Sequence, residues 1–181
     1  MRRYIITGAP GAGKTTILAA LRERGYAVVP EAATDVITDG QARGAEEPWR
    51  EGAFLDRVAL LQRLREREPA GAGVQVFDRS PICTLALAQY SDRPVTPLLA
   101  SEVERVVAEE VYRPGVFFVR LLGFITPSAA RRITYPESVR FERFHEQAYR
   151  KHGFDLIDVP AGPAGQRADL VERHIRADAG R

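Results

Sequence analysis

Eight consecutive residues near the start of the chain have the types and spacing that bind phosphate. They match the pattern G-x-x-x-x-G-K-[ST] and read Gly8-Ala9-Pro10-Gly11-Ala12-Gly13-Lys14-Thr15. Glycines allow the backbone to turn several N–H groups toward phosphate oxygens, and the start of a following helix adds positive potential. Lys14 can reach the β- and γ-phosphates, and the Thr15 hydroxyl is placed to bind Mg²⁺. Together with Thr16, the motif predicts a nucleoside triphosphate site.

The surroundings of this motif favour the phosphate site over its alternative, an ordinary glycine-rich turn between a strand and a helix. Lys14 is one of two lysines in a chain with 24 arginines. Residues 4–6 predict a short buried strand before the loop, and residues 16–24 predict a helix after it. This strand–loop–helix order is the context that the motif requires.

A carboxylate, Asp78, closes the apolar segment 74–77, which predicts a buried strand. In folds with this phosphate loop, a carboxylate at such a strand end holds Mg²⁺, usually through water. We therefore expect Thr15 and Asp78 to form the metal site. The alternative is that Asp78 or Ser80 caps the helix beginning at Pro81, a role that Ser80 fits better.

The residues after Asp78 disfavour two common classes of nucleotide-hydrolysing protein. A GTPase switch would need a glycine three positions after the aspartate, where this chain has Pro81. The chain contains no asparagine and so cannot hold an Asn-Lys-x-Asp guanine motif. Motor-type ATPases usually pair the aspartate with a glutamate, whereas Arg79 occupies that position here. ATP is accordingly preferred over GTP.

Glu31 follows the second predicted strand, residues 26–30. The carboxyl ends of strands in open α/β sheets form the crevice in which ligands bind. A carboxylate there can accept the proton of a substrate hydroxyl as it attacks the γ-phosphate. The alternative is a first-turn glutamate stabilised by the helix dipole. Asp35 lies one turn further on the same helix face and is a secondary candidate.

Strands and helices alternate along the chain, which predicts a mostly parallel sheet with helices on both faces. Expected strands cover residues 4–6, 26–30, 74–78, 116–122 and 154–159. Expected helices cover residues 16–24, 31–43, 52–67, 81–90, 98–112, 136–152 and 165–177, and residues 45–49 form a loop. We therefore expect a three-layer α/β fold with a five-stranded parallel sheet, in one domain spanning residues 1–181.

The composition is that of an ordinary soluble globular protein, with 45% hydrophobic and 28% charged residues. A net charge of +2 gives no case for a nucleic-acid partner. No apolar run approaches the roughly 18 residues of a membrane span, and the first strand begins too early for a signal peptide. The lone Cys83 cannot form an internal disulfide, so we expect a cytoplasmic setting.

Together these motifs resemble the nucleoside and nucleotide kinase branch of P-loop proteins. More closely, Glu31-Ala32-Ala33, Phe77-Asp78-Arg79-Ser80 and residues 141–160 look like the small ATPase-like family related to nicotinamide riboside kinase domains. The resemblance covers nearly the whole chain and implies a P-loop NTPase fold. It also implies that Glu31 acts as the base and that Arg79 helps to hold the reacting phosphates.

By the same resemblance, residues 123–135 form a small lid over the site. Arg131 and Arg132 in this segment would neutralise charge that develops during transfer, and the closed lid would exclude water. Two solvated loop arginines are the alternative. Residues 160–165 would cup the nucleotide base with backbone groups, or serve only as a tight connection.

Other conspicuous side chains receive structural assignments. Three aromatic residues beside the expected acceptor region are assigned to the core rather than to the site: Trp49, Phe54 and Tyr90. Three histidines on predicted helices are too far apart for a metal motif and are assigned to helix surfaces: His145, His152 and His174.

The sequence is thus interpreted as a kinase that transfers the γ-phosphoryl group of ATP, with Mg²⁺, to a small, nucleoside-like metabolite. The rival hypothesis is a regulatory switch that binds and slowly hydrolyses a nucleotide and acts through a partner protein or lipid. A nucleotide-dependent nucleic-acid enzyme is a weaker third hypothesis, because the sequence shows no evident basic stripe.

Overall fold

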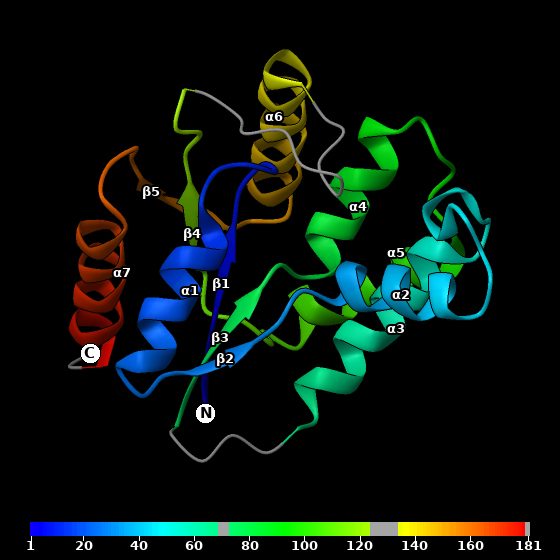
Figure 1. Cartoon of the computed structure of the whole chain (residues 1–181). Coiled ribbons are helices and arrows are strands. Elements are labelled where there is room, and N and C mark those ends of the chain that lie inside the picture. The colour runs from blue at the N-terminus through cyan, green and yellow to red at the C-terminus, as the bar shows by residue number, and fades with distance from the viewer. Residues whose placement is uncertain (69–72, 124–133, 180–181) are drawn as a thin grey trace.

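In the computed structural model, which describes residues 1–68, 73–123 and 134–179, the strands form one parallel five-stranded sheet (Figure 1). Their order across the sheet is β2-β3-β1-β4-β5, and every neighbouring pair is parallel. The strands are β1 (Arg2–Thr7), β2 (Ala27–Val29), β3 (Val74–Asp78), β4 (Gly115–Val119) and β5 (Asp155–Val159). Because the strands are parallel, their carboxyl ends meet at one edge.

Helices cover both faces of this sheet (Figure 1). Helices α1 (Lys14–Glu23) and α7 (Ala164–Ala179) pack together on one face. The other face carries α2 (Ala32–Ala42), α3 (Phe54–Glu66), α4 (Pro81–Tyr90), α5 (Pro97–Ala108) and α6 (Tyr135–Lys151). The predicted three-layer α/β fold with a five-stranded parallel sheet is therefore confirmed.

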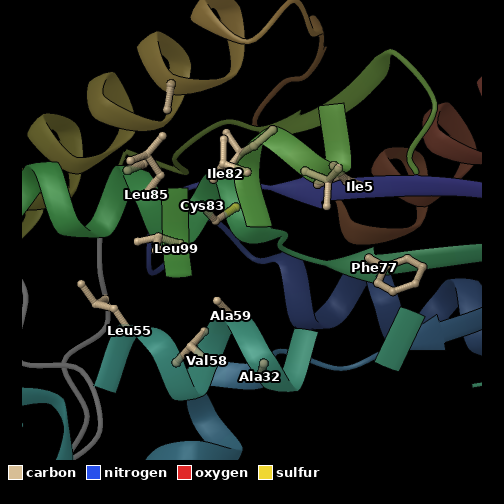
Figure 2. Packing of buried hydrophobic residues seen from close by; sticks show 14 of the residues in the cluster. Ile5, Ala32, Leu55, Val58, Ala59, Phe77, Ile82, Cys83, Leu85 and Leu99 are labelled. Carbon is tan, nitrogen blue, oxygen red and sulfur yellow. The ribbon is translucent and has the colours of Figure 1, made fainter. Parts of the chain in front are cut away.

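The sheet is buried on both faces, which explains its continuous apolar segments. Alternate residues of β1 serve opposite layers: Ile5 packs toward the α2–α6 layer, while Tyr4 and Ile6 pack toward α1 and α7. Figure 2 shows the first layer, in which Ile5 and Phe77 of the sheet lie close to helical side chains. These two cores hold the carboxyl edge of the sheet in a fixed geometry.

Several predicted boundaries are wrong, each for a local reason. The fourth strand ends at Val119 rather than at residue 122, because Val119 already pairs with Val159, the last residue of β5. The helix expected over residues 98–112 ends at Ala108, and Glu110 takes a left-handed φ of 48°. A short 3-10 helix, η1 (Pro48–Arg50), begins within the expected loop 45–49 and extends one residue past it.

None of the helices in the described part of the chain is long and apolar enough to cross a membrane.

The first residue of the phosphate motif, Gly8, follows β1 and lies in close contact with β4. Gly8 has a φ of 145°, a conformation that L-residues with a Cβ rarely adopt. A Cβ atom at this position would lie 2.3 Å from the carbonyl oxygen of Val119. The backbone of the loop can therefore approach β4 only if residue 8 is glycine.

We predict that Gly8→Ala lowers the free energy of unfolding by about 3 kcal/mol or more, since it adds a backbone clash to an unfavourable φ. The matched control is Gly25→Ala, because Gly25 also has a positive φ, 88°, but has open space around its missing Cβ. This control should cost only about 1 kcal/mol. Denaturant unfolding of both variants measures the difference; equal losses would contradict the role assigned to the β4 contact.

Candidate active site

The loop of residues 8–13 connects β1 to α1 and presents backbone N–H groups at its end. Gly11 and Gly13 both have a φ of 86°, and Gly13 directly precedes the helix. Among the described residues no side chain caps the N-terminus of α1, and Thr15 and Thr16 in its first turn are exposed. An uncapped helix start after a glycine-rich turn is suited to an anion.

Lys14 is buried at this loop, and its Nζ donates a hydrogen bond of 3.1 Å to the carbonyl oxygen of Gly8. Burial lowers the pKa of Lys14 from 10.5 to about 8, and the charge of Arg79 adds to this shift. Asp78 and Glu31 act in the opposite direction but do not restore the pKa. The ammonium group is thus costly to keep charged without an anion beside it.

Asp78 ends β3 next to the loop, and its Oδ1 is buried with no hydrogen-bond partner among the described residues. Burial raises the pKa of Asp78, although Lys14 and Arg79 oppose the shift. Asp78 and Thr15 line one cavity of about 330 Å³. An orphaned carboxylate oxygen beside a threonine hydroxyl fits Mg²⁺, which prefers oxygen ligands and keeps several waters. These two residues could therefore hold the metal.

Arg79 directly follows Asp78 and has an unusual backbone conformation. Its φ of 74° is left-handed, and its N–H donates to the carbonyl oxygen of Ile6 at 3.0 Å. The buried guanidinium donates from Nε to Glu31 Oε1 and contacts His145 Nε2 at 3.2 Å. Strained conformations of this kind are retained where the surroundings over-determine them, commonly in active sites.

Glu31 lies between β2 and α2 and is held as an anion. Its Oε1 accepts from Arg79, and its Oε2 accepts from the Thr34 hydroxyl at 2.8 Å. Burial by itself would raise the pKa of Glu31, but Arg79, Lys14 and these hydrogen bonds together lower it to about 2. The side chain makes no helix-capping hydrogen bond. Glu31 is therefore ionised at neutral pH, and it is a weak base while Arg79 is paired with it.

His145 of α6 is fully buried, so the sequence-based expectation of a helix-surface position is wrong. Its Nδ1 donates to the carbonyl oxygen of Phe141 at 3.0 Å, which leaves Nε2 to accept from Arg79. Burial, followed by the charge of Arg79, lowers the pKa of His145 to about 3, so the ring is neutral. The apolar spacing of Phe141, His145 and Tyr149 is the sequence signal that could have revealed this.

A second cavity, of about 190 Å³, lies on the other side of Glu31. Apolar residues from α2, α3, α4 and α6 form most of its wall: Ala33, Val58, Leu87 and Phe141. Polar groups come from Glu31, Arg79, Gln62 and Thr84, and the Thr84 hydroxyl donates to Gln62 Oε1 at 3.1 Å. Glu31 therefore lines both the cavity that contains Thr15 and Asp78 and the mostly apolar one, which Pro10 of the phosphate loop also lines.

Two other predicted residues have structural roles. Asp35 forms an ion pair with Arg65, which also donates to the carbonyl oxygen of Pro30 at 2.8 Å. Ser80 precedes α4 but makes no capping hydrogen bond, because its hydroxyl is hydrogen-bonded to that of Tyr149 at 2.8 Å. Arg131 and Arg132, and nearly all of the lid predicted over residues 123–135, lie outside the described residues.

The aromatic residues expected in the core lie there or beside it. Phe54 is buried, and Trp49 packs against the core that faces the α2–α6 layer. Tyr90 meets Phe141 edge-on at a ring distance of 4.8 Å and so lies behind the wall of the apolar cavity.

Comparison with known proteins places this geometry in a family. A family model described as an AAA domain (AAA_28) matches residues 3–167, and the chain belongs to this family. The fold is that of the P-loop nucleoside and nucleotide kinases, as the sequence motifs predicted. A nucleotide-binding protein of Granulibacter bethesdensis is 33% identical over 119 residues, which cover 61% of this chain and 36% of that protein. The chain thus spans about a third of that relative.

Two solved structures share the fold at low sequence identity. Thymidylate kinase from Ehrlichia chaffeensis has a TM-score of 0.66 and 12% identity, covering 96% of this chain and 98% of that one. Deoxyadenosine kinase from M. mycoides with bound dATP has a TM-score of 0.61 and 15% identity, covering 96% and 99%. Both similarities extend over nearly the whole length of each chain.

The ion pair between Glu31 and Arg79 predicts a pH-dependent stability. The folded pKa of Glu31 is about 2 and its ordinary value is 4.5, so the pair stabilises the fold above pH 4.5. That contribution is lost as the pH falls from about 4.5 toward 2. Urea unfolding should show that the advantage of the parent over Glu31→Gln shrinks by on the order of 2 kcal/mol across this interval.

Glu23→Gln, at an exposed position near the end of α1, serves as the control and should show little change with pH. If the difference between the parent and Glu31→Gln stays constant with pH, Glu31 is not held by the ion pair in solution.

Proposed function

We propose that this protein is an ATP- and Mg²⁺-dependent phosphotransferase acting on a small, nucleoside-like metabolite. The observation that carries the proposal is that Glu31 lines two cavities. One cavity contains Thr15 and Asp78 beside the phosphate loop, and the other is mostly apolar. A phosphoryl donor and an acceptor in these two cavities would meet at the carboxylate.

Each charged residue then has a role in positioning and electrostatic stabilisation. The backbone N–H groups of residues 8–16, apart from Pro10 which has none, and the Lys14 ammonium hold the phosphates. Thr15 and Asp78 hold Mg²⁺, which neutralises charge on the β- and γ-phosphate oxygens when bound. Arg79 holds the transferred phosphoryl group, and Arg131 or Arg132 of the lid offsets developing charge.

Glu31 accepts the proton of the acceptor hydroxyl in this scheme. A carboxylate with a pKa of about 2 is a weak base as long as Arg79 is paired with it. Phosphate oxygens in the neighbouring cavity compete for the same guanidinium, and its movement toward them raises the proton affinity of Glu31. Glu31 is then a stronger base when the phosphoryl donor is bound.

The wall of the apolar cavity supports a nucleoside-like acceptor. The ring of Phe141 and the side chains of Val58 and Leu87 offer flat, dry contacts for a base, and the amide of Gln62 offers one polar contact. The solved structures with this fold include a thymidylate kinase and a deoxyadenosine kinase with bound dATP, which agrees with this class of acceptor.

A regulatory switch that slowly hydrolyses its nucleotide is the second candidate. This candidate is favoured by the relative from Granulibacter bethesdensis, which is a nucleotide-binding protein. The matched segment makes up only 36% of that relative. A longer chain of that kind provides room for further segments that could respond to the bound nucleotide.

The proposal is tested by measuring ADP release from ATP with and without Mg²⁺, in the presence of single nucleosides, nucleotides and small hydroxylated metabolites. We expect one acceptor to stimulate ADP release and to become phosphorylated. Glu31→Gln should bind ATP like the parent and lose this activity by about two orders of magnitude or more. Glu23→Gln, distant from both cavities, should keep the activity of the parent.

The kinase proposal would be refuted if no acceptor stimulated ADP release and if Glu31→Gln released ADP from ATP like the parent. The regulatory switch would then account better for the phosphate loop.

The lowered pKa of Lys14 predicts that nucleotide affinity depends on pH. Lys14 is charged below its pKa of about 8, so ATP binds tightly there. Above that value the neutral amine of Lys14 must first take up a proton, and the affinity should fall by up to about tenfold per pH unit. Fluorescence titrations with a labelled ATP analogue between about pH 7 and 10 measure this profile.

Two lysine variants serve as controls. Lys14→Arg keeps its charge over this range and should give a flat profile, whatever its absolute affinity. Lys151→Arg changes the other lysine of the chain, which is exposed, and should reproduce the fall seen for the parent. A parental profile that is flat to about pH 10 would contradict the assignment of Lys14.

A further inference from the structure

Arg167, in the first turn of α7, links the phosphate loop to the ends of two strands. Its Nη1 donates to the carbonyl oxygen of Ala12 at 2.7 Å. Its Nη2 donates to the carbonyl oxygens of Arg120 at 2.8 Å and of Val159 at 3.4 Å. A single side chain from the C-terminal helix thus joins the loop to the carboxyl ends of β4 and β5.

The guanidinium of Arg167 is buried without a compensating anion. Only 4% of the residue is exposed, and among the described residues no carboxylate lies within ion-pair distance of it. Its Nε is buried without a hydrogen-bond partner in the same part of the chain, and burial lowers the pKa of Arg167. Other arginines with little exposed side chain, Arg65 and Arg105, each have an acidic partner.

A buried cation without a neighbouring anion lowers the stability of the fold, so the position of Arg167 needs an explanation. Asp78 and Glu31 act on Lys14 in the same loop, whereas burial is the only cause of the lowered pKa of Arg167, with no contribution from a described carboxylate. An anion bound at the phosphate loop would bring a compensating negative charge close to Arg167.

Peptide geometry explains what the contact with Ala12 achieves. The carbonyl of Ala12 and the N–H of Gly13 belong to one planar trans peptide unit and point in opposite directions. Because Arg167 holds the carbonyl, the Gly13 N–H is directed away from the guanidinium. A Cβ at Gly13 would lie 3.0 Å from Arg167 Nη1, so the arginine packs directly against the glycine.

We propose that Arg167 is a positioning residue for polyphosphate binding, which fixes the Ala12–Gly13 peptide so that its N–H faces the phosphates. The bound polyphosphate supplies the anion that Arg167 lacks among the described residues. This inference rests on the proposed nucleotide binding and adds a residue to that site. Arg167 acts through the backbone of the loop and does not itself touch the ligand.

The test compares Arg167→Met with the parent by calorimetric titration with two probes, Mg·ATP and inorganic tripolyphosphate. Tripolyphosphate has no base, so it reports on the phosphate loop alone. We expect the affinity for both probes to fall by the same factor, about tenfold or more. Arg167→Lys keeps a charge and a donor, and should recover part of the affinity for both.

Arg105→Met is the matched control, since Arg105 is a poorly exposed arginine paired with Glu66 and Glu102 near the opposite edge of the sheet. It should lower the unfolding temperature and leave the affinity for both probes unchanged. If Arg167→Met fails to fold, Arg167→Lys decides: weaker binding of both probes at an unchanged unfolding temperature supports the proposal.

Two results would overturn the inference while the parent binds both probes. In one, Arg167→Met binds both as tightly as the parent. In the other, only Mg·ATP binding weakens, which would mean that Arg167 acts through Val159 and the segment after β5 on the base. A parent that binds neither probe would instead refute the proposed function, and with it the inference.

Discussion

Burial of charge at the carboxyl edge of the sheet is the constraint on which the rest of this structure depends. Lys14, Arg79 and Arg167 bring three cations there, and Glu31 and Asp78 bring two carboxylates, of which only Glu31 is fully engaged with a protein partner. The lowered pKa of Lys14 and the raised pKa of Asp78 share the same dominant cause, which is desolvation. Such an arrangement holds only on a rigid support, and the two hydrophobic cores on either side of the sheet supply it.

Helix α6 covers the sheet and also contributes side chains to the site at its carboxyl edge. Successive buried residues along it contact different parts of the site: Phe141 lines the apolar cavity, His145 contacts Arg79, and Tyr149 contacts Ser80. The helix directly follows the segment expected to form the lid. A displacement of α6 along its axis would therefore change the cavity wall and the orientation of Arg79 together.

The position of the phosphate loop, Glu31 and Asp78 at one edge of the sheet could be predicted from the sequence, because each lies at or just after the end of a strand and parallel strands bring such positions together. His145 and Arg167 could not be assigned in the same way. Each lies on a helix far from its partners in the sequence, and only tertiary packing buries it: 66 residues separate His145 from Arg79, and 155 separate Arg167 from Ala12. The overextended fourth strand and the helix expected to reach residue 112 show a related limit. In both segments the apolar residues continue beyond the true end of the element. The strand ends where its partner β5 ends, and after the helix the φ angle of Glu110 becomes positive.

The adjacency of Asp78 and Arg79 has a consequence for how this chain can change. The pairing of β3 with β1 sets Asp78 opposite Ile6, and the next residue turns the other way. Loss of one residue within β3 would place a guanidinium where the carboxylate now lies and reverse the local sign of charge, and gain of one residue would place the ring of Phe77 there. A substitution on an outer helix changes one side chain, whereas a change in the length of this strand would shift every following residue relative to the hydrogen-bond ladder of the sheet.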